Sequence, residues 1–440
     1  METFLIKALQ LIFSLSILVL VHEFGHFIFS RIFKVRVEKF YLFFDPWFSI
    51  FKFKPKNSDT EYGLGWLPLG GYCKISGMID ESLDMEQMAL PPKPYEFRSK
   101  PAGQRLLIMT AGVIFNFLLA LFIYSMVLLH WGDKYVPLKN VTYGMEFSST
   151  YKNIGFVDGD MLLSADGIML ERFNDDCLRK LIEAKTVTVL RDGKEVNIAI
   201  PDDMIQRVMR DKEGVANYRL PMIIAEVTAK SAIDAGFKSG DRIMCVNEVN
   251  TISHSDVINT LRDNKGNTVN FEVVRNGQSV SLTAPVDTSG RIGISSIISL
   301  SDIYETVTVK YNIFSSIPAG IGLGINTLKG YVNDMKYIFS KEGAKNVGGF
   351  GAIGSLFPAA WDWRMFWERT AFLSIILAFM NILPIPMLDG GHVMFLLYEV
   401  VTRRKPADKF LEYAQITGMI LLFSLLIFAN GNDLVRFFSK

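Results

Sequence analysis

Apolar residues gather into four long blocks along the chain. The clearest block covers residues 106–129, which are 24 consecutive residues without a charge. About 20 apolar residues suffice to cross a bilayer as a helix. The pattern therefore predicts four transmembrane helices, over residues 4–30, 106–129, 366–391 and 411–430.

Basic residues are concentrated in two connections between these blocks. The segment 31–105 has four lysines or arginines near its start and three near its end, and residues 403–409 carry four more. Lys and Arg close to span ends favour the cytoplasmic side. We therefore expect both connections in the cytoplasm, and both chain termini and the long segment 131–365 on the exported side.

The exported segment contains an internal repeat. Residues 155–160 read GFVDGD and residues 236–241 read GFKSGD, while residues 187–196 resemble residues 271–280. The offsets between these pairs are 81 and 84 residues. Two copies of one small module, inserted between the second and third spans, explain both similarities.

Within each copy, short alternating segments flank a turn dipeptide, which is Asp192-Gly193 in the first and Asn276-Gly277 in the second. Such dipeptides are strong signals for β-hairpins. The modules are therefore expected to be rich in β-structure. One helix is expected in each copy, over residues 174–184 and 255–263, with the N-caps Asn174 and Ser255.

Residues 303–345 follow the repeat and have apolar residues at intervals of three or four, interrupted by Pro318 and five glycines. This periodicity predicts an amphipathic helical segment. An interfacial element at the exported membrane surface is one interpretation. Ordinary packing beneath the modules is the other.

Composition excludes several classes of protein. The 440 residues include 46 Lys+Arg and 45 Asp+Glu, so a net charge of +1 gives no electrostatic reason to expect nucleic acid. The three cysteines lie far apart in the sequence, and the chain contains no CxxC motif. A disulfide scaffold and a cysteine-based zinc site are therefore excluded.

The first span contains His22, Glu23 and His26 in the run HEFGH. Two histidines four residues apart lie on one face of a helix, where both can bind a single metal ion. Ionisable residues inside a span are costly unless they are paired or coordinating. We therefore predict a metal site, with Glu23 as a general base beside it.

A catalytic zinc site normally has three protein ligands. No third histidine lies in register, and Asp389 closes an apolar span at the same expected membrane depth as His22 and His26. Pro384 and Pro386 prevent a regular helix just before it. Asp389 is the best candidate for the third ligand, although a cytoplasmic helix cap in a Gly-terminated turn would explain the same pattern.

The segment 235–247 reads A-G-F-x-x-G-D-x-I-x-x-V-N and resembles the bacterial PDZ domain, which predicts such domains over residues 216–290 and 141–203. With HEFGH in the first span and N-x-L-P-x-P-x-L-D-G-G at residues 381–391, nearly the whole chain resembles the site-2 protease family of intramembrane zinc metalloproteases. The most similar branch is that of the bacterial regulator-of-sigma-E proteases.

This resemblance implies a polytopic α-helical membrane protein with two tandem PDZ domains between its second and third spans. It implies Zn²⁺ bound by His22, His26 and Asp389, with Glu23 as the catalytic base. It also implies cleavage within or near the transmembrane segment of a single-span protein already shortened by another protease, such as an anti-sigma factor or a remnant signal peptide. The expected location is the bacterial inner membrane, with the active site toward the cytoplasm.

The family pattern also implies substrate-binding roles for four residues. Gly63 and Gly65 match the GxG of a membrane-associated β-loop at residues 63–78. Asn116 matches a second-span signature that has Val113 where proline is common, and Asn381 matches the third-span motif. Without the resemblance, the two asparagines would be read as helix-packing residues.

Two other functions remain open at this point. The chain would act as a catalytically silent membrane scaffold if its PDZ pair only recruited partners. Alternatively, the metal site would serve another purpose, and the chain would be a zinc-dependent enzyme of another kind, such as a lipid hydrolase, or a metal transporter. The PDZ domains themselves either bind an extended peptide at a sheet edge or exclude folded substrates by size.

Overall fold

The structure is a computed structural model that describes residues 2–78, 90–211, 213–296, 299–338, 343–344 and 347–438. The chain divides into two compact units. The first, here called the helical unit, joins Met1–Gly132 to Lys310–Lys440, and the second, the inserted unit, is Asp133–Val309.

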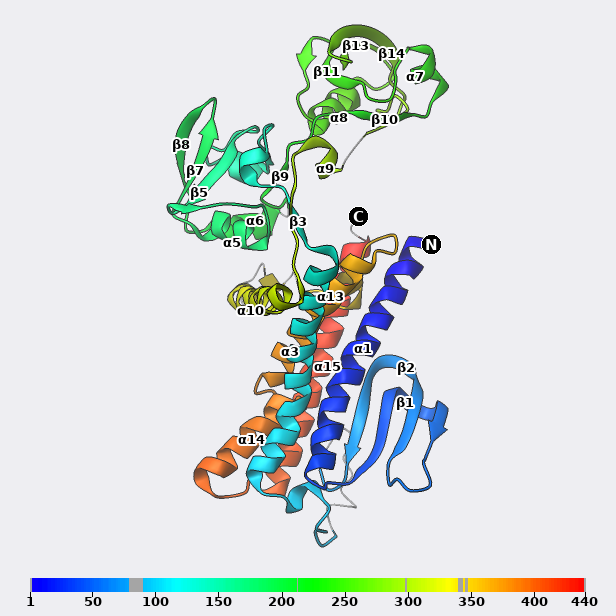
Figure 1. The fold of residues 1–440 in the computed structure, drawn as a ribbon, viewed down its shortest axis with the longest axis vertical. Coiled ribbons are helices and arrows are strands. Elements are labelled where there is room, and N and C mark those ends of the chain that lie inside the picture. Colours follow the sequence, from blue (N-terminus) through cyan, green and yellow to red (C-terminus); the bar gives the residue numbers. More distant parts are fainter. Residues whose placement is uncertain are drawn as a thin grey trace. The chain divides into compact units, whose positions relative to one another are not determined.

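Four long helices form the helical unit, as the apolar blocks predict (Figure 1). Each is long and apolar enough to cross a membrane. Both chain termini lie at the same end of this unit, which agrees with an even number of crossings (Figure 1). The helices are α1 Glu2–Ile32, α3 Ala102–Trp131, α13 Trp363–Ile382 and α15 Asp408–Phe438.

The third span differs from the expected helix over residues 366–391. Helix α13 ends at Ile382, and a separate helix, α14 Asp389–Thr402, follows six residues of irregular backbone. Pro384 and Pro386 lie in this break, where proline cannot continue the helical hydrogen bonds. The acidic residue of the motif therefore stands at the first position of α14 instead of inside a continuous span.

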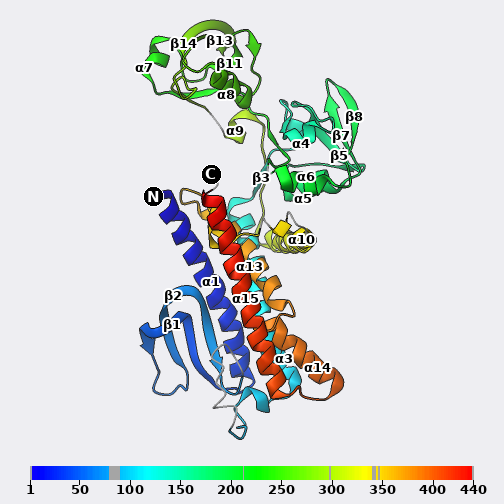
Figure 2. The ribbon, with the colours of Figure 1, turned by 180° about the vertical axis from the view of Figure 1, so that it is seen from behind.

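A curved antiparallel hairpin lies beside α1 (Figure 2) and consists of β1 Val37–Phe53 and β2 Glu61–Ile75. The first half of β1 pairs on both sides, so that Phe40 faces Cys73 on one side and Tyr62 on the other. The second half of β1 pairs again with the start of β2. Residues 71–75 consequently form an edge that pairs on one side only within the described part of the chain.

Helix α10, Ile313–Ile338, runs through Pro318 without a break, so the expected interruption there is wrong. It crosses α3 (Figures 1 and 2) and buries the small residues Ser316, Gly320 and Gly324. Large side chains such as Phe314 remain exposed. The glycines therefore serve close helix packing, as in other small-residue helix contacts. Residues 339–342 and 345 of the predicted segment lie outside the described residues.

The inserted unit contains two four-stranded sheets with the same strand order, β6-β5-β7-β8 and β12-β11-β13-β14. The strands of the first sheet are β5 Met161–Ala165, β6 Ile168–Met169, β7 Thr186–Arg191 and β8 Lys194–Ala199. Those of the second are β11 Arg242–Val246, β12 Val249–Asn250, β13 Thr268–Arg275 and β14 Gln278–Pro285.

Three short strand pairs complete this unit: β3 Asp133–Tyr135 with β16 Val307–Val309, β4 Met145–Phe147 with β9 Ala216–Tyr218, and β10 Ile224–Val227 with β15 Ile294–Ser296. Because β9 pairs with β4, residues 216–218 belong with the first module, and the expected boundary at residue 216 differs from the structure.

Short helices cover the two modules. They are α4 Ser149–Lys152, α5 Asp175–Glu183, α6 Met204–Asp211, α7 Lys230–Asp234, α8 His254–Asp263 and α9 Leu300–Ile303. Asn174 caps α5 as expected. The expected Ser255 cap is wrong, because Ser253 caps α8 in a reciprocal capping box with Asp256. The helix thus begins one residue earlier and Ser255 lies inside its first turn.

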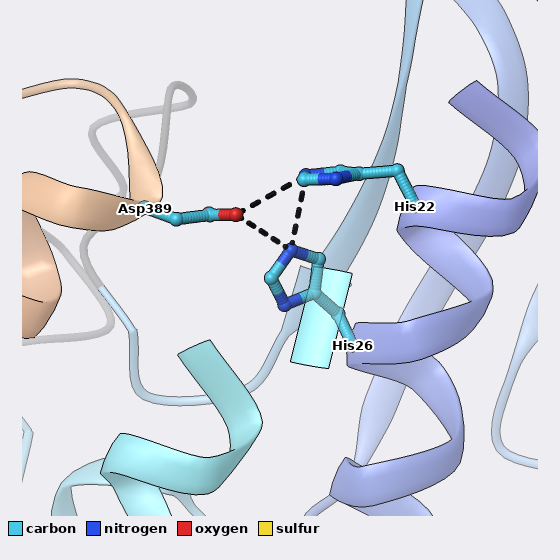
Figure 3. Close-up of side chains that lie close together, drawn as sticks. All are labelled: His22, His26 and Asp389. Carbon is cyan, nitrogen blue, oxygen red and sulfur yellow. Dashed lines mark hydrogen bonds and ion pairs between the residues drawn. The ribbon is translucent and has the colours of Figure 1, made fainter. Parts of the chain in front are cut away.

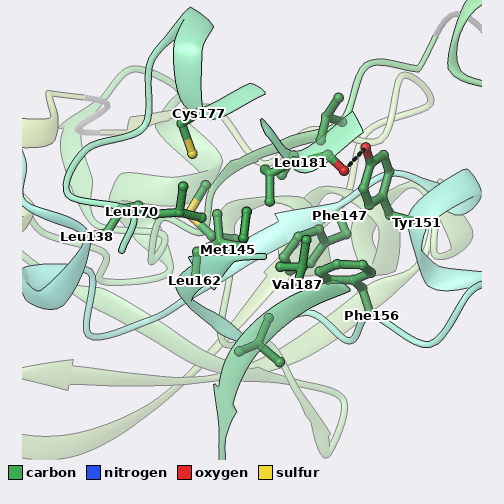
Figure 4. Packing of buried hydrophobic residues seen from close by; sticks show 14 of the residues in the cluster. Leu138, Met145, Phe147, Tyr151, Phe156, Leu162, Leu170, Cys177, Leu181 and Val187 are labelled. Carbon is green, nitrogen blue, oxygen red and sulfur yellow. Dashed lines mark hydrogen bonds between the residues drawn. The ribbon is translucent and has the colours of Figure 1, made fainter. Parts of the chain in front are cut away.

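Each module has its own apolar core. In the first, Phe147, Tyr151 and Phe156 pack together, and the buried Tyr151 hydroxyl donates to the Leu181 carbonyl at 3.3 Å (Figure 4). In the second, Phe237 packs edge-on against Phe271. Alternate residues of the repeated strands face these cores, namely Val187 and Val189 of β7 and Val269, Phe271 and Val273 of β13.

The repeated sequence motifs contact each other within each module. Arg191 donates two hydrogen bonds of 2.7 Å to Asp160, and Arg275 donates two of 2.7 Å to Asp241. Burial of Asp241 would raise its pKa, but the hydrogen bonds from Arg275 and from the Lys238 backbone N–H, together with the charges of Arg275 and Lys238, outweigh burial and hold that pKa below its ordinary value. The GD of one motif and the Arg of the other therefore form the same bidentate ion pair in both modules.

Candidate metal centre

Three side chains that are far apart in the sequence converge in the helical unit (Figure 3). His22 and His26 project from α1, and Asp389 projects from the start of α14. The Asp389 Oδ2 atom lies 3.2 Å from His22 Nε2 and 3.3 Å from His26 Nε2. The two Nε2 atoms are 3.3 Å apart, so the three atoms form a nearly equilateral triangle.

This triangle fits a tetrahedral zinc ion. With zinc bonds of 2.0–2.1 Å, neighbouring ligand atoms of a tetrahedron are about 3.3 Å apart. The Asp389 Oδ2 atom is also buried without a hydrogen-bond donor among the described residues. A buried carboxylate oxygen facing two ring nitrogens is costly unless a metal ion or a proton on one of the rings lies between them.

The surroundings of His26 determine which of its ring nitrogens is unprotonated and can offer a lone pair to a metal ion. His26 Nδ1 lies 2.9 Å from the Ile108 carbonyl oxygen. A carbonyl only accepts, so Nδ1 carries the proton and Nε2 is the free ligand atom. Such an outer hydrogen bond is the usual support for a metal-bound histidine.

Glycines allow α1 and α3 to approach closely at this position. A Cβ on Gly25 would lie 2.6 Å from the Ala111 carbonyl oxygen. A Cβ on Gly112 would meet both imidazoles, lying 2.7 Å from His22 Cε1. Only glycine fits at either position without a shift, because real Cβ contacts are longer than these. Close packing therefore explains the Ala111-Gly112 pair in the second span. Ala111 contacts Gly25, and Gly112 leaves room for the two imidazole rings.

A cavity of about 640 Å³ opens onto the triad. Glu23, the predicted base, lines it together with His22, His26 and Asp389. Residues 70–75 of β2 form another wall. The backbone N–H of Cys73 in this strand lies near enough to the Glu23 carboxylate to interact with it electrostatically. The arrangement places the Glu23 carboxylate, the His22–His26–Asp389 triad and a strand edge around one cavity.

The residues predicted to bind substrate occupy different places. Asn381 lines the cavity, and its Nδ2 lies 3.4 Å from His22 Nε2. Asn116 is fully buried, does not line the cavity, and its Nδ2 lies 3.2 Å from His22 Nδ1. Gly63 and Gly65 lie within the hairpin, where Tyr41 and Phe44 cover the positions of their missing side chains. Neither glycine lines the cavity.

Two cavity residues were missed by sequence reasoning. His392 lines the cavity one helical turn after Asp389, and Gln415 reaches it from α15. Gln415 Nε2 lies 2.9 Å from His392 Nε2. The i, i+3 spacing from Asp389 to His392 was a visible signal, because such residues share a helix face. Nothing in the sequence pattern pointed to Gln415.

Comparison with known proteins agrees with this geometry. The model of peptidase family M50 matches residues 10–425. The chain is 29% identical to the Regulator of sigma E protease of Salmonella typhi, covering 97% of both chains. It is 28% identical to the Regulator of sigma-E protease RseP of Escherichia coli, covering 99% of this chain and all of that protein. The Metalloprotease MmpA of Caulobacter vibrioides is 26% identical over 99% of this chain.

The family match covers nearly the whole chain, and the peptidases of this family depend on zinc. The converging triad and the adjacent carboxylate belong to the same helical unit as the four apolar helices. The chain belongs to peptidase family M50, the site-2 proteases, and is a zinc metalloendopeptidase of the membrane.

Proposed function

We propose that this enzyme hydrolyses a peptide bond within or near the transmembrane segment of a single-span membrane protein. The observation that carries the proposal is the common location of Glu23, the triad and the strand edge 70–75 around one cavity between apolar helices. His22, His26 and Asp389 are the proposed zinc ligands. The proposed substrate is of the anti-sigma or remnant signal-peptide type, shortened beforehand by another protease. Two relatives are named as regulators of sigma-E, which supports the anti-sigma type.

The strand edge supplies what a helical substrate needs. A transmembrane helix satisfies its own backbone, so its peptide bonds are shielded until it unwinds. Unwinding in lipid leaves polar groups unpaired at a cost of several kcal/mol each. Within the described hairpin, residues 71–75 pair with β1 along one edge only, and an extended substrate segment that adds to the other edge would regain its backbone hydrogen bonds. The Asn381 amide at the cavity offers a further polar contact.

Glu23 is the proposed proton carrier of the reaction. Zinc, when bound, supplies Lewis-acid polarisation of the scissile carbonyl. The Glu23 carboxylate removes a proton from a water molecule, whose oxygen forms the new bond to the carbonyl carbon. The same carboxyl group then gives its proton to the departing amide nitrogen as the C–N bond breaks.

The inserted unit has a proposed role in substrate selection. Its two four-stranded modules of equal strand order support the assignment as tandem PDZ domains on the exported side. They would bind an extended segment or exclude folded domains by size. The exposed apolar face of α10 supports a position at the membrane surface near the same side. With the active site toward the cytoplasm, the proposed location is the bacterial inner membrane.

The deciding experiment is cleavage of a candidate single-span substrate by purified wild type and Glu23→Gln. We expect the variant to retain zinc and to lose at least about 100-fold in rate, the usual scale for a general base. Zinc analysis of His22→Phe is the companion measurement, and its metal content should fall. Product from Glu23→Gln at the wild-type rate would exclude Glu23 as the base, and full zinc content in His22→Phe would exclude His22 as a zinc ligand.

A further inference from the structure

The Asn116 side chain contacts the Nδ1 atom of His22, and this contact affects which ring nitrogen is free to bind zinc. Asn116 on α3 is fully buried, and its Nδ2 lies 3.2 Å from His22 Nδ1. The other ring nitrogen, Nε2, faces Asp389. We propose that Asn116 is a positioning residue that accepts a hydrogen bond from His22 Nδ1–H through its Oδ1 and so presents Nε2 to zinc as a lone pair. This inference rests on the proposed role of His22 as a ligand.

The tautomer of His22 follows from simple donor and acceptor counting. An amide Nδ2 only donates, so in the orientation described above His22 Nδ1 must be the acceptor. The neutral ring would then carry its proton on Nε2, the atom that faces His26 and Asp389, and this proton would leave the donor-only Asn381 Nδ2, 3.4 Å away, without an acceptor there. A proton at that atom excludes it as a metal ligand. Zinc binding therefore requires the opposite tautomer and an acceptor at Nδ1.

The Asn116 amide contains the required acceptor. Its Oδ1 is buried without a hydrogen-bond partner among the described residues, which is a costly arrangement. Rotation of the amide by 180° exchanges Oδ1 and Nδ2 with almost no change of shape. In that orientation Oδ1 takes the place of Nδ2 beside His22 Nδ1. The unpartnered oxygen then gains a donor, the amide N–H₂ takes the position that has no partner among the described residues, and His22 Nε2 becomes free for zinc.

The location of Asn116 favours this role over direct substrate binding. Asn116 does not line the cavity, whereas Asn381 does. The Ser374 hydroxyl of α13 donates to the Asn116 carbonyl oxygen at 2.7 Å and fixes the backbone there. His26 has its equivalent support from the Ile108 carbonyl. Both ligand rings would thus be oriented from α3, one by backbone and one by a side chain.

The test compares zinc affinity, measured by competition with a chelator, in full-length wild type, Asn116→Leu and Asn116→Asp. Leu has a similar size but no acceptor, so its zinc affinity should fall about 10- to 100-fold. Asp retains the acceptor and should remain within about threefold of wild type or bind more tightly. Ser125→Ala on the same helix is the control, since the Ser125 hydroxyl bonds only to the Leu121 carbonyl in the described residues, and its affinity should not change.

Other outcomes would overturn the inference. Unchanged zinc affinity in Asn116→Leu together with a raised KM would make Asn116 a substrate-binding residue. Equal losses in the Leu and Asp variants would exclude the acceptor role. If Asn116→Leu does not fold, as judged by its melting curve, Asn116→Ala replaces it and must show the same loss. Weak zinc binding by wild type itself would contradict the metal assignment instead, so the two failures are distinguishable.

Discussion

Gly112 lies at the point where α3 passes beneath the two histidine rings. A Cβ there would lie 2.7 Å from His22 Cε1 and 2.9 Å from His22 Nδ1. Gly112→Ala should therefore displace the ring and weaken zinc binding by at least about tenfold, because ligand orientation controls metal affinity. Chelator competition measures the effect. Gly103→Ala in the first turn of the same helix is the matched control, since a Cβ there would meet no atom within 4 Å and zinc affinity should be unchanged.

Asp241 and Arg275 form a bidentate ion pair that stabilises the second module. Asp241→Asn should lower the stability of the second module by about 2 kcal/mol, because it leaves the guanidinium without its charged partner. Hydrogen exchange of peptides from residues 222–296 in the full chain measures this loss. Asp203→Asn, at an exposed i, i+4 pair with Arg207, should change exchange very little.

The same ion pair sets a pH dependence. The pKa of Asp241 is lower in the folded module than its ordinary value near 3.8, so its ionised form stabilises the fold. This stabilisation is present above about pH 4 and is lost as the pH falls through the folded pKa. Exchange in wild type should accelerate over that acid range, and Asp241→Asn should show a weaker dependence. An equal acid response in both proteins would contradict this assignment.

At the scale of elements, the break between α13 and α14 depends on the packing of α15. A Cβ on Gly418 would lie 2.5 Å from the Pro386 carbonyl carbon. Gly418→Ala should therefore push residues 383–388 aside, destabilise the protein by about 1–3 kcal/mol and lower zinc retention. Gly431→Ala on the same helix has no atom within 4 Å and should leave both properties unchanged. Thermal melts with and without chelator distinguish the two variants.

Some helices and strands can be predicted from the sequence, and others depend on tertiary packing. The spans and the Asn174 cap follow from local patterns, because helix length and capping depend on neighbouring residues. The identity of 71–75 as the strand edge does not, since it depends on β1 pairing with both halves of β2. The interruption predicted at Pro318 is absent because tertiary packing also decides the length of α10. The packing of α10 against its neighbours outweighs the loss of one helical hydrogen bond.

At the scale of the whole molecule, the proposed orientation can be measured with single cysteines. Lys194 is exposed in the inserted unit, and Lys405 is exposed between α14 and α15. The substitutions Lys194→Cys and Lys405→Cys each place one reactive thiol at these positions. In a background with Cys73→Ser and Cys245→Ser, the remaining Cys177 should react slowly because burial raises its pKa to about 11. An impermeant maleimide should label position 194 in right-side-out vesicles and position 405 only after lysis. The reverse pattern would contradict the proposed topology.

Short-range patterns in the chain were enough to predict several features of the molecule. Helix periodicity places His22 and His26 on one face, hydropathy defines the spans, and the repeated GD and Arg motifs indicate two equal modules. The sequence also identified Asp389 as the best third ligand, but its meeting with the two rings depends on the break after Ile382 and on the packing of separate helices.

The set of groups that share the cavity follows from the three-dimensional packing alone. That packing brings Gln415 to His392, sets residues 70–75 beside Glu23, and directs Asn116 toward His22 instead of the cavity. Asn116 and His22 are 94 residues apart, and Gln415 lies on the last helix. Such pairs are set by helix approach and strand register, which arise from the packing of the whole unit and have no local signature in the chain.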